Sequence, residues 1–153
     1  MMEFVEFQVD SPLYRQYFEL RNDVLRRPLG LSLFDEDLSD EELSWHFALF
    51  EQRVVACVML TPLDEMDVPT AKLRQMCVCP KMSRQGLGKQ LVERVEVIAR
   101  ARGVRKVTMS ARVSAESFYH KLGYETVGSS FLSVGIPHVT MQKLLQVMSP
   151  EQS

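Results

Sequence analysis

The sequence has few cysteines, no long apolar run and no excess of basic charge, and each of these absences argues against a class of protein. Three cysteines in 153 residues predict no disulfide framework, and they favour a reducing, cytoplasmic setting. No run of apolar residues is long enough to cross a bilayer. The formal net charge is −2 and no basic tract contains interleaved aromatic residues, so we expect neither nucleic acid nor a membrane surface as a partner.

A metal site is not expected either. Cys77 and Cys79 form a close pair, but no second cysteine pair follows, and no nearby histidine completes the four ligands of a zinc site. On a strand, two such cysteines serve as small buried apolar groups. The two cysteines are therefore expected to be structural.

A length of 153 residues predicts a single domain over residues 1–153. The spacing of apolar residues predicts that strands and helices are mixed within it. Strands are expected at 3–9, 46–50, 54–61, 71–79, 104–111, 124–128 and 139–144, and helices at 11–27, 88–102 and 114–122, with a short one from Ser39. The residues from Met148 on are expected to fray. The strand–helix–strand order over residues 71–111 implies a right-handed crossover and hence a parallel strand pair. These elements predict an α/β (α+β) fold, a single mixed, mostly antiparallel twisted sheet with one central parallel strand pair and helices on both faces.

The segment from Val78 to Lys89, VCPKMSRQGLGK, is the most informative part of the chain. It ends a strand, passes through a proline-marked loop with Gly86 and Gly88, and leads into a strongly amphipathic helix. Backbone N–H groups converge at such a helix start, where the helix dipole is positive, so the segment predicts a cradle for a phosphate or pyrophosphate. Taken alone, the two glycines are equally consistent with a plain turn before a helix.

Two well-known phosphate motifs do not fit this loop. A dinucleotide fingerprint requires a third glycine where the chain has Leu91. A P-loop requires a leading glycine where the chain has Ser83, and a serine or threonine where it has Gln90. An unrelated ATP-binding or NAD-binding domain is therefore disfavoured.

A second segment changes the interpretation of the loop. Residues 115–124 meet the pattern A-x-x-F-Y-x-K-x-G-[FY] in full, and the loop glycines follow a V-x-P triplet that begins at Val78. With these two motifs in order, residues 71–144 resemble the GNAT superfamily of acyl-CoA-dependent N-acetyltransferases. The loop departs from the family pattern at one position, where Ser83 replaces a glutamine or arginine. This change affects side-chain contacts only, because backbone N–H groups do not depend on the side chain.

The resemblance implies a GNAT-like fold and an acetyltransferase activity. The enzyme would move the acetyl group from acetyl-CoA, as co-substrate and without a metal, to a primary amine of a small molecule or peptide, by direct attack in a ternary complex. A non-catalytic GNAT-fold module that binds or senses acyl-CoA is the alternative. Dimers are common in the family, and an exposed edge on the last strands would allow a homodimer.

The resemblance also implies where acetyl-CoA is held. The pyrophosphate is expected on backbone N–H groups of the loop, and the pantetheine arm is expected to pair with a strand edge like an added strand. The implied cofactor-binding residues are Met76, Cys77, Val78, Arg84, Gln85, Gly86, Leu87, Gly88, Lys89, Ala111, Ala115, Phe118 and Tyr119. The charges of Arg84 and Lys89 are equally compatible with a solvated surface role.

Three groups are implied for the chemistry. The backbone N–H of Met76 would donate to the thioester carbonyl oxygen as that oxygen gains negative charge. Tyr119 would donate a proton to the leaving thiolate, because a phenol has an ordinary pKa of about 10 and a thiol one of about 8.5. The alternative for this tyrosine is plain packing. His138, in the segment GIPH, is the candidate base for the amine, with a structural role as its alternative.

Substrate contacts are expected from Lys72 and Arg74, which alternation places on the same strand face as Met76. Many relatives carry a glutamate or histidine base on this face. An arginine cannot act as that base, and it recognises carboxylates or phosphates instead, so Arg74 favours an acidic substrate. A salt bridge from Arg74 to an internal acid is equally consistent with the sequence. Arg27, near the end of the first helix, and His138 complete the candidate substrate residues.

Overall fold

The computed structural model describes residues 2–64 and 67–146, and the expected fraying from Met148 lies outside these ranges. The strands are β1 (Glu3–Phe7), β2 (Trp45–Phe50), β3 (Val54–Leu63), β4 (Thr70–Val78), β5 (Lys106–Arg112), β6 (Glu125–Ser133) and β7 (Ile136–Leu144). The α-helices are α1 (Tyr14–Leu25), α2 (Leu87–Ala101) and α3 (Glu116–Lys121). One-turn 3-10 helices lie at η1 (Arg27–Leu29), η2 (Leu33–Asp35), η3 (Glu41–Leu43), η4 (Pro80–Met82) and η5 (Val113–Ala115). No helix within the described ranges is long and apolar enough to cross a membrane.

The strands form a seven-stranded sheet in the order β1-β2-β3-β4-β5-β7-β6. β4 and β5 are parallel, with residues 70–72 opposite residues 106–108. The pairings of β1 with β2, β2 with β3, β5 with β7 and β6 with β7 are antiparallel. The predicted fold class, a mostly antiparallel mixed sheet with a central parallel pair, is confirmed.

The described chain divides into two compact units, which separate the two sequence motifs. The first unit comprises residues 2–61 and 74–95, and the second comprises residues 62–64, 67–73 and 96–146. The glycine loop and the start of α2 lie in the first unit, whereas α3 and strands β5 to β7 lie in the second.

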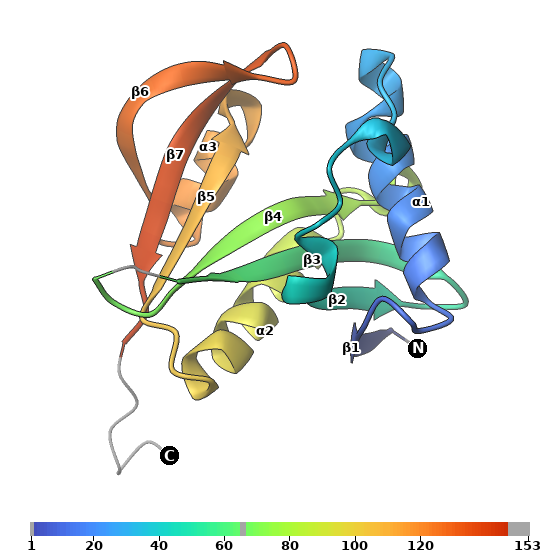
Figure 1. The fold of residues 1–153 in the computed structure, drawn as a ribbon, viewed down its shortest axis with the longest axis horizontal. Helices are drawn as coiled ribbons and strands as arrows, with labels where there is room; N and C mark the ends of the chain where they lie inside the picture. The colour runs from blue at the N-terminus through green and yellow to red at the C-terminus, as the bar shows by residue number, and fades with distance from the viewer. Residues whose placement is uncertain (1, 65–66, 147–153) are drawn as a thin grey trace. The chain divides into compact units, whose positions relative to one another are not determined.

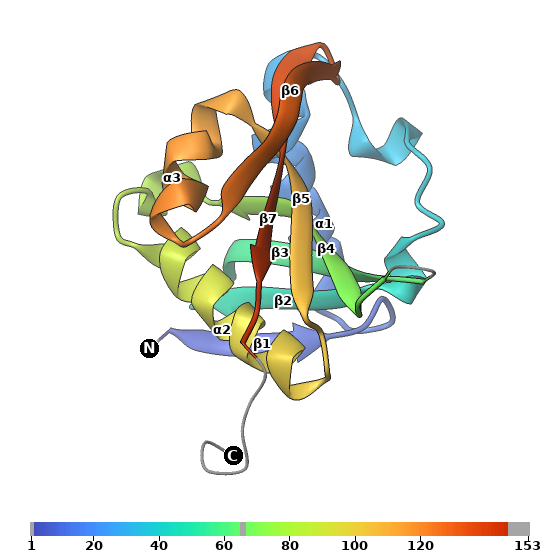
Figure 2. The same cartoon turned by 90° about the vertical axis from the view of Figure 1, so that its left-hand side faces the viewer.

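In the first unit, helices cover both faces of the strands. On one face, Tyr17 of α1 lies in a buried cluster with Ala48 of β2 and Cys57 of β3. On the other face, the guanidinium carbon of Arg94, in α2, lies 4.6 Å from the ring centroid of Phe4 in β1. Figures 1 and 2 show α1 and α2 on opposite sides of β2 and β3. This packing confirms, within the first unit, the prediction of helices on both faces.

In the second unit, β6 and β7 form a long hairpin that joins β5 through β7 (Figure 1). The two residues of its turn, Val134 and Gly135, have φ values of 47° and 79°, which is the type I′ geometry of tight hairpins. The strands expected at 124–128 and 139–144 are therefore too short on the turn side. Val134 concealed this turn, because a β-branched residue seldom adopts positive φ.

Two elements near the N-terminus also begin or end differently from the prediction. α1 begins at Tyr14 and not at residue 11, because Ser11 forms a turn before it. The side-chain oxygen of Ser11 accepts the N–H of Leu13 at 3.1 Å, and its carbonyl accepts the N–H of Tyr14 at 3.0 Å. The helix expected from Ser39 is only the single turn η3, because the chain is already extended at Ser44.

Candidate active site

The loop before α2 has the geometry of an anion-binding turn. Arg84 and Gly86 adopt left-handed backbone conformations, with φ values of 65° and 74°, and residues 83–86 are exposed. The N–H of Gln90 donates to the carbonyl of Gly86 at 3.0 Å, so the N–H groups of residues 87–89 have no acceptor one helical turn back within α2. Left-handed turns at a helix start direct such N–H groups to one point and favour an anion there.

Glycine is needed at position 86 for its backbone angle. A Cβ at Gly86 would meet no atom within 4 Å, so the requirement concerns φ and not space. The side chain of Lys89 is exposed, and its Nζ lies 3.9 Å from Oε1 of Glu93, one turn further along α2. The lysine charge is thus partly balanced at the helix surface, so a cradle at this loop would consist chiefly of backbone N–H groups.

The end of β4 presents backbone groups along one edge. The N–H of Cys79 donates to the carbonyl of Val55 in β3 at 2.7 Å. Successive N–H groups of an extended chain alternate between its two edges, so those of Val78 and Met76 point to the edge away from β3. An edge with unpaired backbone groups is where an added strand, or a chain of amides that imitates one, can bind.

Two of the three cysteines of the first unit lie in its interior, whereas Cys79 is partly exposed and is not the buried apolar group that was expected. Cys57 and Cys77 are buried with their Sγ atoms 3.6 Å apart. Burial raises the pKa of the Cys57 thiol well above its ordinary value, which makes this thiol unreactive. In the part of the chain that the structure describes, no group of three histidine, cysteine, aspartate or glutamate side chains is arranged to hold a metal ion.

Gln75, the residue before Met76, has an unusual backbone conformation. Its φ is 56°, a left-handed value that costs a non-glycine residue about 1–3 kcal/mol and therefore needs support from its surroundings. Arg21 of α1 provides a contact, because its Nε donates to Oε1 of Gln75 at 2.7 Å. The same guanidinium donates to both carboxylate oxygens of Glu41, at 2.7 and 3.0 Å, and Arg21 is fully buried.

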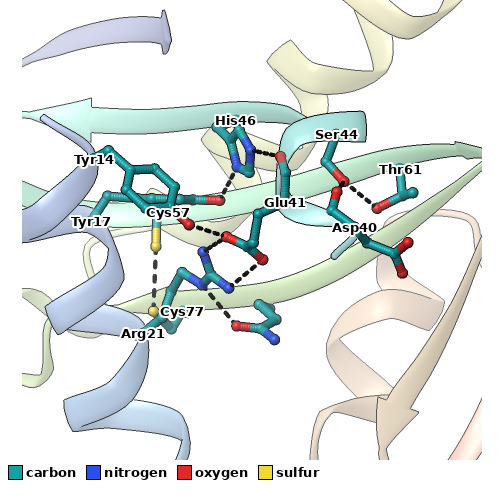
Figure 3. A network of polar contacts seen from close by, with 11 residues as sticks. Tyr14, Tyr17, Arg21, Asp40, Glu41, Ser44, His46, Cys57, Thr61 and Cys77 are labelled. Carbon is teal, nitrogen blue, oxygen red and sulfur yellow. Dashed lines mark hydrogen bonds and ion pairs between the residues drawn. The ribbon is translucent and has the colours of Figure 1, made fainter. Parts of the chain in front are cut away.

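Aromatic side chains contact the Arg21–Glu41 pair, and Figure 3 shows two of them, Tyr14 and Tyr17, beside it. The guanidinium carbon of Arg21 lies 4.8 Å from the ring centroid of Tyr17 and 5.3 Å from that of Phe18. The hydroxyl of Tyr14 donates to Oε1 of Glu41 at 2.5 Å. Burial alone would raise the pKa of Glu41, but the hydrogen bonds and the charge of Arg21 outweigh it and hold the pKa below its ordinary value. The carboxylate is thus ionised at neutral pH and fixes Arg21 in one orientation.

His46 continues this network as a neutral ring (Figure 3). Its Nε2 lies 2.6 Å from the carbonyl oxygen of Glu41, which can only accept, so Nε2 carries the hydrogen. Its Nδ1 then accepts from the hydroxyl of Tyr17 at 2.7 Å. Burial lowers the pKa of His46, in keeping with the neutral form. Because both ring nitrogens are engaged inside the protein, we assign His46 a structural role.

The unfolding free energy is expected to fall as the pH drops below about 6.5, the ordinary pKa of histidine. The folded protein resists protonation of His46 and the unfolded chain does not, so acid favours unfolding. One such group contributes a slope of at most about 1.4 kcal/mol per pH unit. Urea unfolding at a series of pH values between about 5 and about 8 measures this slope. In His46→Gln, whose amide retains a donor and an acceptor, the slope should shrink, and an unchanged slope would contradict the assignment.

The basic residues proposed to contact substrate have acidic neighbours in the first unit. Nη1 of Arg74 lies 2.9 Å from Oδ2 of Asp40, which is the salt-bridge alternative considered for this arginine. Both side chains are partly exposed, so the pair is weak and Arg74 stays a candidate for substrate contact. Nη1 of Arg27 lies 3.0 Å from Oδ1 of Asp23 on the exposed side of α1. Lys72 is half-buried in the part of β4 that belongs to the second unit.

In the second unit, the motif residues Ala115, Phe118 and Tyr119 share the continuous segment of η5 and α3. Tyr119 is buried, and its ring centroid lies 4.9 Å from that of Phe118 and 5.8 Å from that of Tyr124. The carbonyl of Tyr119 accepts the N–H of Tyr124 at 3.0 Å, which fixes this residue at the end of the helix.

His138 lies near the start of β7, opposite Arg112 of β5 and one register position from the pair of Ala111 and Val139. Its Nδ1 lies 2.9 Å from the carbonyl oxygen of Ile136 and therefore carries the hydrogen. In the neutral ring, Nε2 is then the nitrogen that can accept a proton. The histidine is 7% exposed, and its geometry is compatible with both the base role and the structural alternative.

The glycine loop and the α3 motif were recognisable in the sequence, whereas the network of Arg21, Glu41 and Gln75 was not predicted. One signal was available. Arg21 follows Tyr17 by four residues and precedes Val24 by three, which places it on the apolar face of α1. A charged residue at such a position requires a buried partner.

Comparison with known proteins agrees with this fold and with the two motifs. The model of the acetyltransferase (GNAT) domain family matches residues 32–145. A Bacillus subtilis (strain 168) protein whose name gives acetyltransferase as its proposed activity is 32% identical over 130 residues, which cover 82% of this chain and 86% of that protein.

Solved structures share the fold over almost the whole chain. One is a Lactobacillus plantarum protein whose name proposes N-acetyltransferase activity, with a TM-score of 0.82, 23% identity and coverage of 95% of this chain and 99% of that one. Another is a GNAT family acetyltransferase from Elizabethkingia anophelis with acetyl-CoA bound, with a TM-score of 0.66, 17% identity and coverage of 94% and 98%. These structures show that the fold is shared. The family model matches most of the chain, and the Bacillus relative covers most of it as well. The protein therefore belongs to the GNAT acetyltransferase family.

Proposed function

We propose that this acetyltransferase uses acetyl-CoA and transfers the acetyl group to a primary amine of a small molecule or peptide, by direct attack in a ternary complex. The observation that carries the proposal is the exposed loop in which Arg84 and Gly86 turn the backbone N–H groups toward one point at the start of α2. Membership of the GNAT family supports it, as does the acetyl-CoA bound to the Elizabethkingia neighbour.

Each step of the reaction is assigned to one group. The amine nitrogen attacks the thioester carbonyl carbon, and the carbonyl oxygen, as it gains charge, accepts a hydrogen bond from the N–H of Met76. The carbon–sulfur bond breaks, and the hydroxyl of Tyr119 donates a proton to the departing thiolate. Nε2 of His138 takes the proton that the amine loses. Pyrophosphate oxygens accept from the N–H groups of residues 84–89.

Replacing Gly86 by alanine is expected to weaken CoA binding by about tenfold or more. A left-handed alanine costs about 1–2 kcal/mol, and the loop escapes this cost only by turning its N–H groups away from the anion. Isothermal titration with CoA as the probe measures the loss. ATP and NAD serve as comparison ligands in a thermal unfolding assay. If either of them raises the melting temperature and CoA does not, the proposal is contradicted.

The chain offers a matched control for this substitution. Gly30 has a φ of 72°, against 74° for Gly86, and an added Cβ meets no atom within 4 Å at either position. Gly30→Ala should therefore carry a similar strain and a similar loss of thermal stability, with CoA affinity unchanged. Equal losses of CoA affinity in the two variants would show that the effect is general destabilisation and would remove the cradle as its cause.

A further inference from the structure

The first unit completely buries Arg21, and this arginine contacts the strand that carries Met76. Its Nε donates to Oε1 of Gln75 at 2.7 Å, and the side chain has no exposed surface. A buried guanidinium is retained only with its donors satisfied, and here Glu41 and Gln75 accept three of its N–H groups. The proposed chemistry assigns no role to this cluster, so its position beside Met76 needs an explanation.

The backbone angles of Gln75 decide where the N–H of Met76 points. That N–H belongs to the peptide plane between the two residues, so a change of Gln75 from left-handed to extended backbone rotates the plane. Gln75 has a φ of 56° without being a glycine, and such a conformation persists only where the surroundings fix it. Within the described contacts of the Gln75 side chain, the restraint is the hydrogen bond from Arg21.

We infer that Arg21 is a positioning residue for the reaction, which acts by holding Gln75 in its left-handed conformation and thereby aims the N–H of Met76 at the thioester oxygen. The inference rests on the proposed function, because only a thioester gives this N–H a catalytic task. Arginine suits the role, since its planar fork can bind both oxygens of Glu41 while Nε reaches Gln75. A lysine keeps the buried charge beside Glu41 but has no second, fixed donor for Gln75.

The experiment combines Arg21→Lys with Gln75→Gly. Glycine adopts positive φ without support, so it should not need the arginine. We expect Arg21→Lys to lower kcat about tenfold, because the donor to the oxygen is misaligned, while KM for acetyl-CoA changes by less than about threefold. In the double variant Arg21→Lys, Gln75→Gly, kcat should return to within about threefold of the Gln75→Gly single variant. The assay follows CoA release from acetyl-CoA in a fixed mixture of amino acids and polyamines.

A matched control separates positioning from a general effect of arginine loss. Arg26, at the end of α1, is also largely buried and is ion-paired with Glu36, and neither residue is assigned to the site. Arg26→Lys should leave kcat unchanged. Nitrogen-15 NMR adds a readout without turnover, in which the amide signals of Gln75 and Met76 should shift in Arg21→Lys and keep their positions in Arg26→Lys.

The outcomes distinguish this inference from the proposed function. If the wild-type protein releases CoA and Arg21→Lys keeps its kcat, or if adding Gln75→Gly fails to relieve the loss, the positioning role is overturned and the transferase proposal stands. Amide signals of Gln75 and Met76 that do not move in Arg21→Lys would also overturn the positioning role. If the wild-type protein binds acetyl-CoA but releases no CoA with any amine, the transferase proposal itself fails, and the inference that rests on it fails with it.

Discussion

The Glu41→Ala variant is expected to lose about 3–5 kcal/mol of unfolding free energy, the typical cost of removing one partner from a buried ion pair. The substitution leaves the guanidinium of Arg21 buried without a counter-charge, and it takes away the acceptor of the Tyr14 hydroxyl. A loss of this size is a large fraction of the total stability of an ordinary domain, which is about 5–15 kcal/mol. Urea unfolding followed by circular dichroism measures it.

The preceding residue provides the control. Asp40 also pairs with an arginine, but its partner Arg74 and its own carboxylate are partly exposed, so Asp40→Ala should cost less than about 1 kcal/mol. Replacing both buried partners together, as Arg21→Met and Glu41→Leu, should recover most of the stability that Glu41→Ala loses, because no charge is left unpaired. A Glu41→Ala variant no less stable than Asp40→Ala would contradict the assigned role of the buried pair.

The pH dependence of stability gives a second check on Glu41. Its pKa is lower in the folded protein than in the unfolded chain, where it is about 4.3. Its contribution to the unfolding free energy is therefore fully present above that unfolded-state pKa, and it is lost as the pH falls through the lower folded-state pKa. The wild-type protein should therefore lose stability steeply in this acidic range. The Glu41→Ala variant lacks the group and should show a smaller loss over the same range.

The order of strands and helices was predictable because most of these elements show a clear period of apolar residues. The parallel pair of β4 and β5 followed from the strand–helix–strand order around α2. The hairpin of β6 and β7 was underestimated, because its turn uses Val134 where asparagine or glycine is usual, and Gly135 alone is a weak sign of that turn. Strands, helices and turns are therefore predictable where the conformational preferences of the residues agree with the tertiary structure.

The candidate site also has one part that was predictable from the sequence and one part that was not. The turn at the start of α2 was predictable because glycines before an amphipathic helix mark it in the sequence, and the role proposed for it depends on backbone N–H groups only. The support of Gln75 by Arg21 was not predictable, because 54 residues separate the two and the left-handed conformation of a glutamine has no signature in the sequence. Contacts between distant segments depend on the packing of α1 against β4, which only the structure supplies.

The Tyr119→Phe variant is expected to lower kcat by about 100-fold, within the usual range for removing a positioned acid. Only the hydroxyl is lost, and the ring keeps its contacts with Phe118 and Tyr124. Without a proton donor, the negative charge on the departing sulfur is not neutralised. This slows the chemical step and leaves binding unchanged. CoA affinity, measured by titration, should therefore stay within about threefold of the wild type.

Tyr124 provides the matched control, because its hydroxyl has an identified structural partner in the same unit. It donates to Oε2 of Glu96 at 2.8 Å, and Nζ of Lys143 lies 2.8 Å from the other oxygen of that carboxylate. Tyr124→Phe should lower stability by about 1.5–3 kcal/mol, the usual loss for a hydrogen bond to a charged group, and should leave kcat unchanged. If Tyr119→Phe instead keeps its kcat and loses CoA affinity, the hydroxyl serves to hold the cofactor, and the proton must reach the thiolate from another donor.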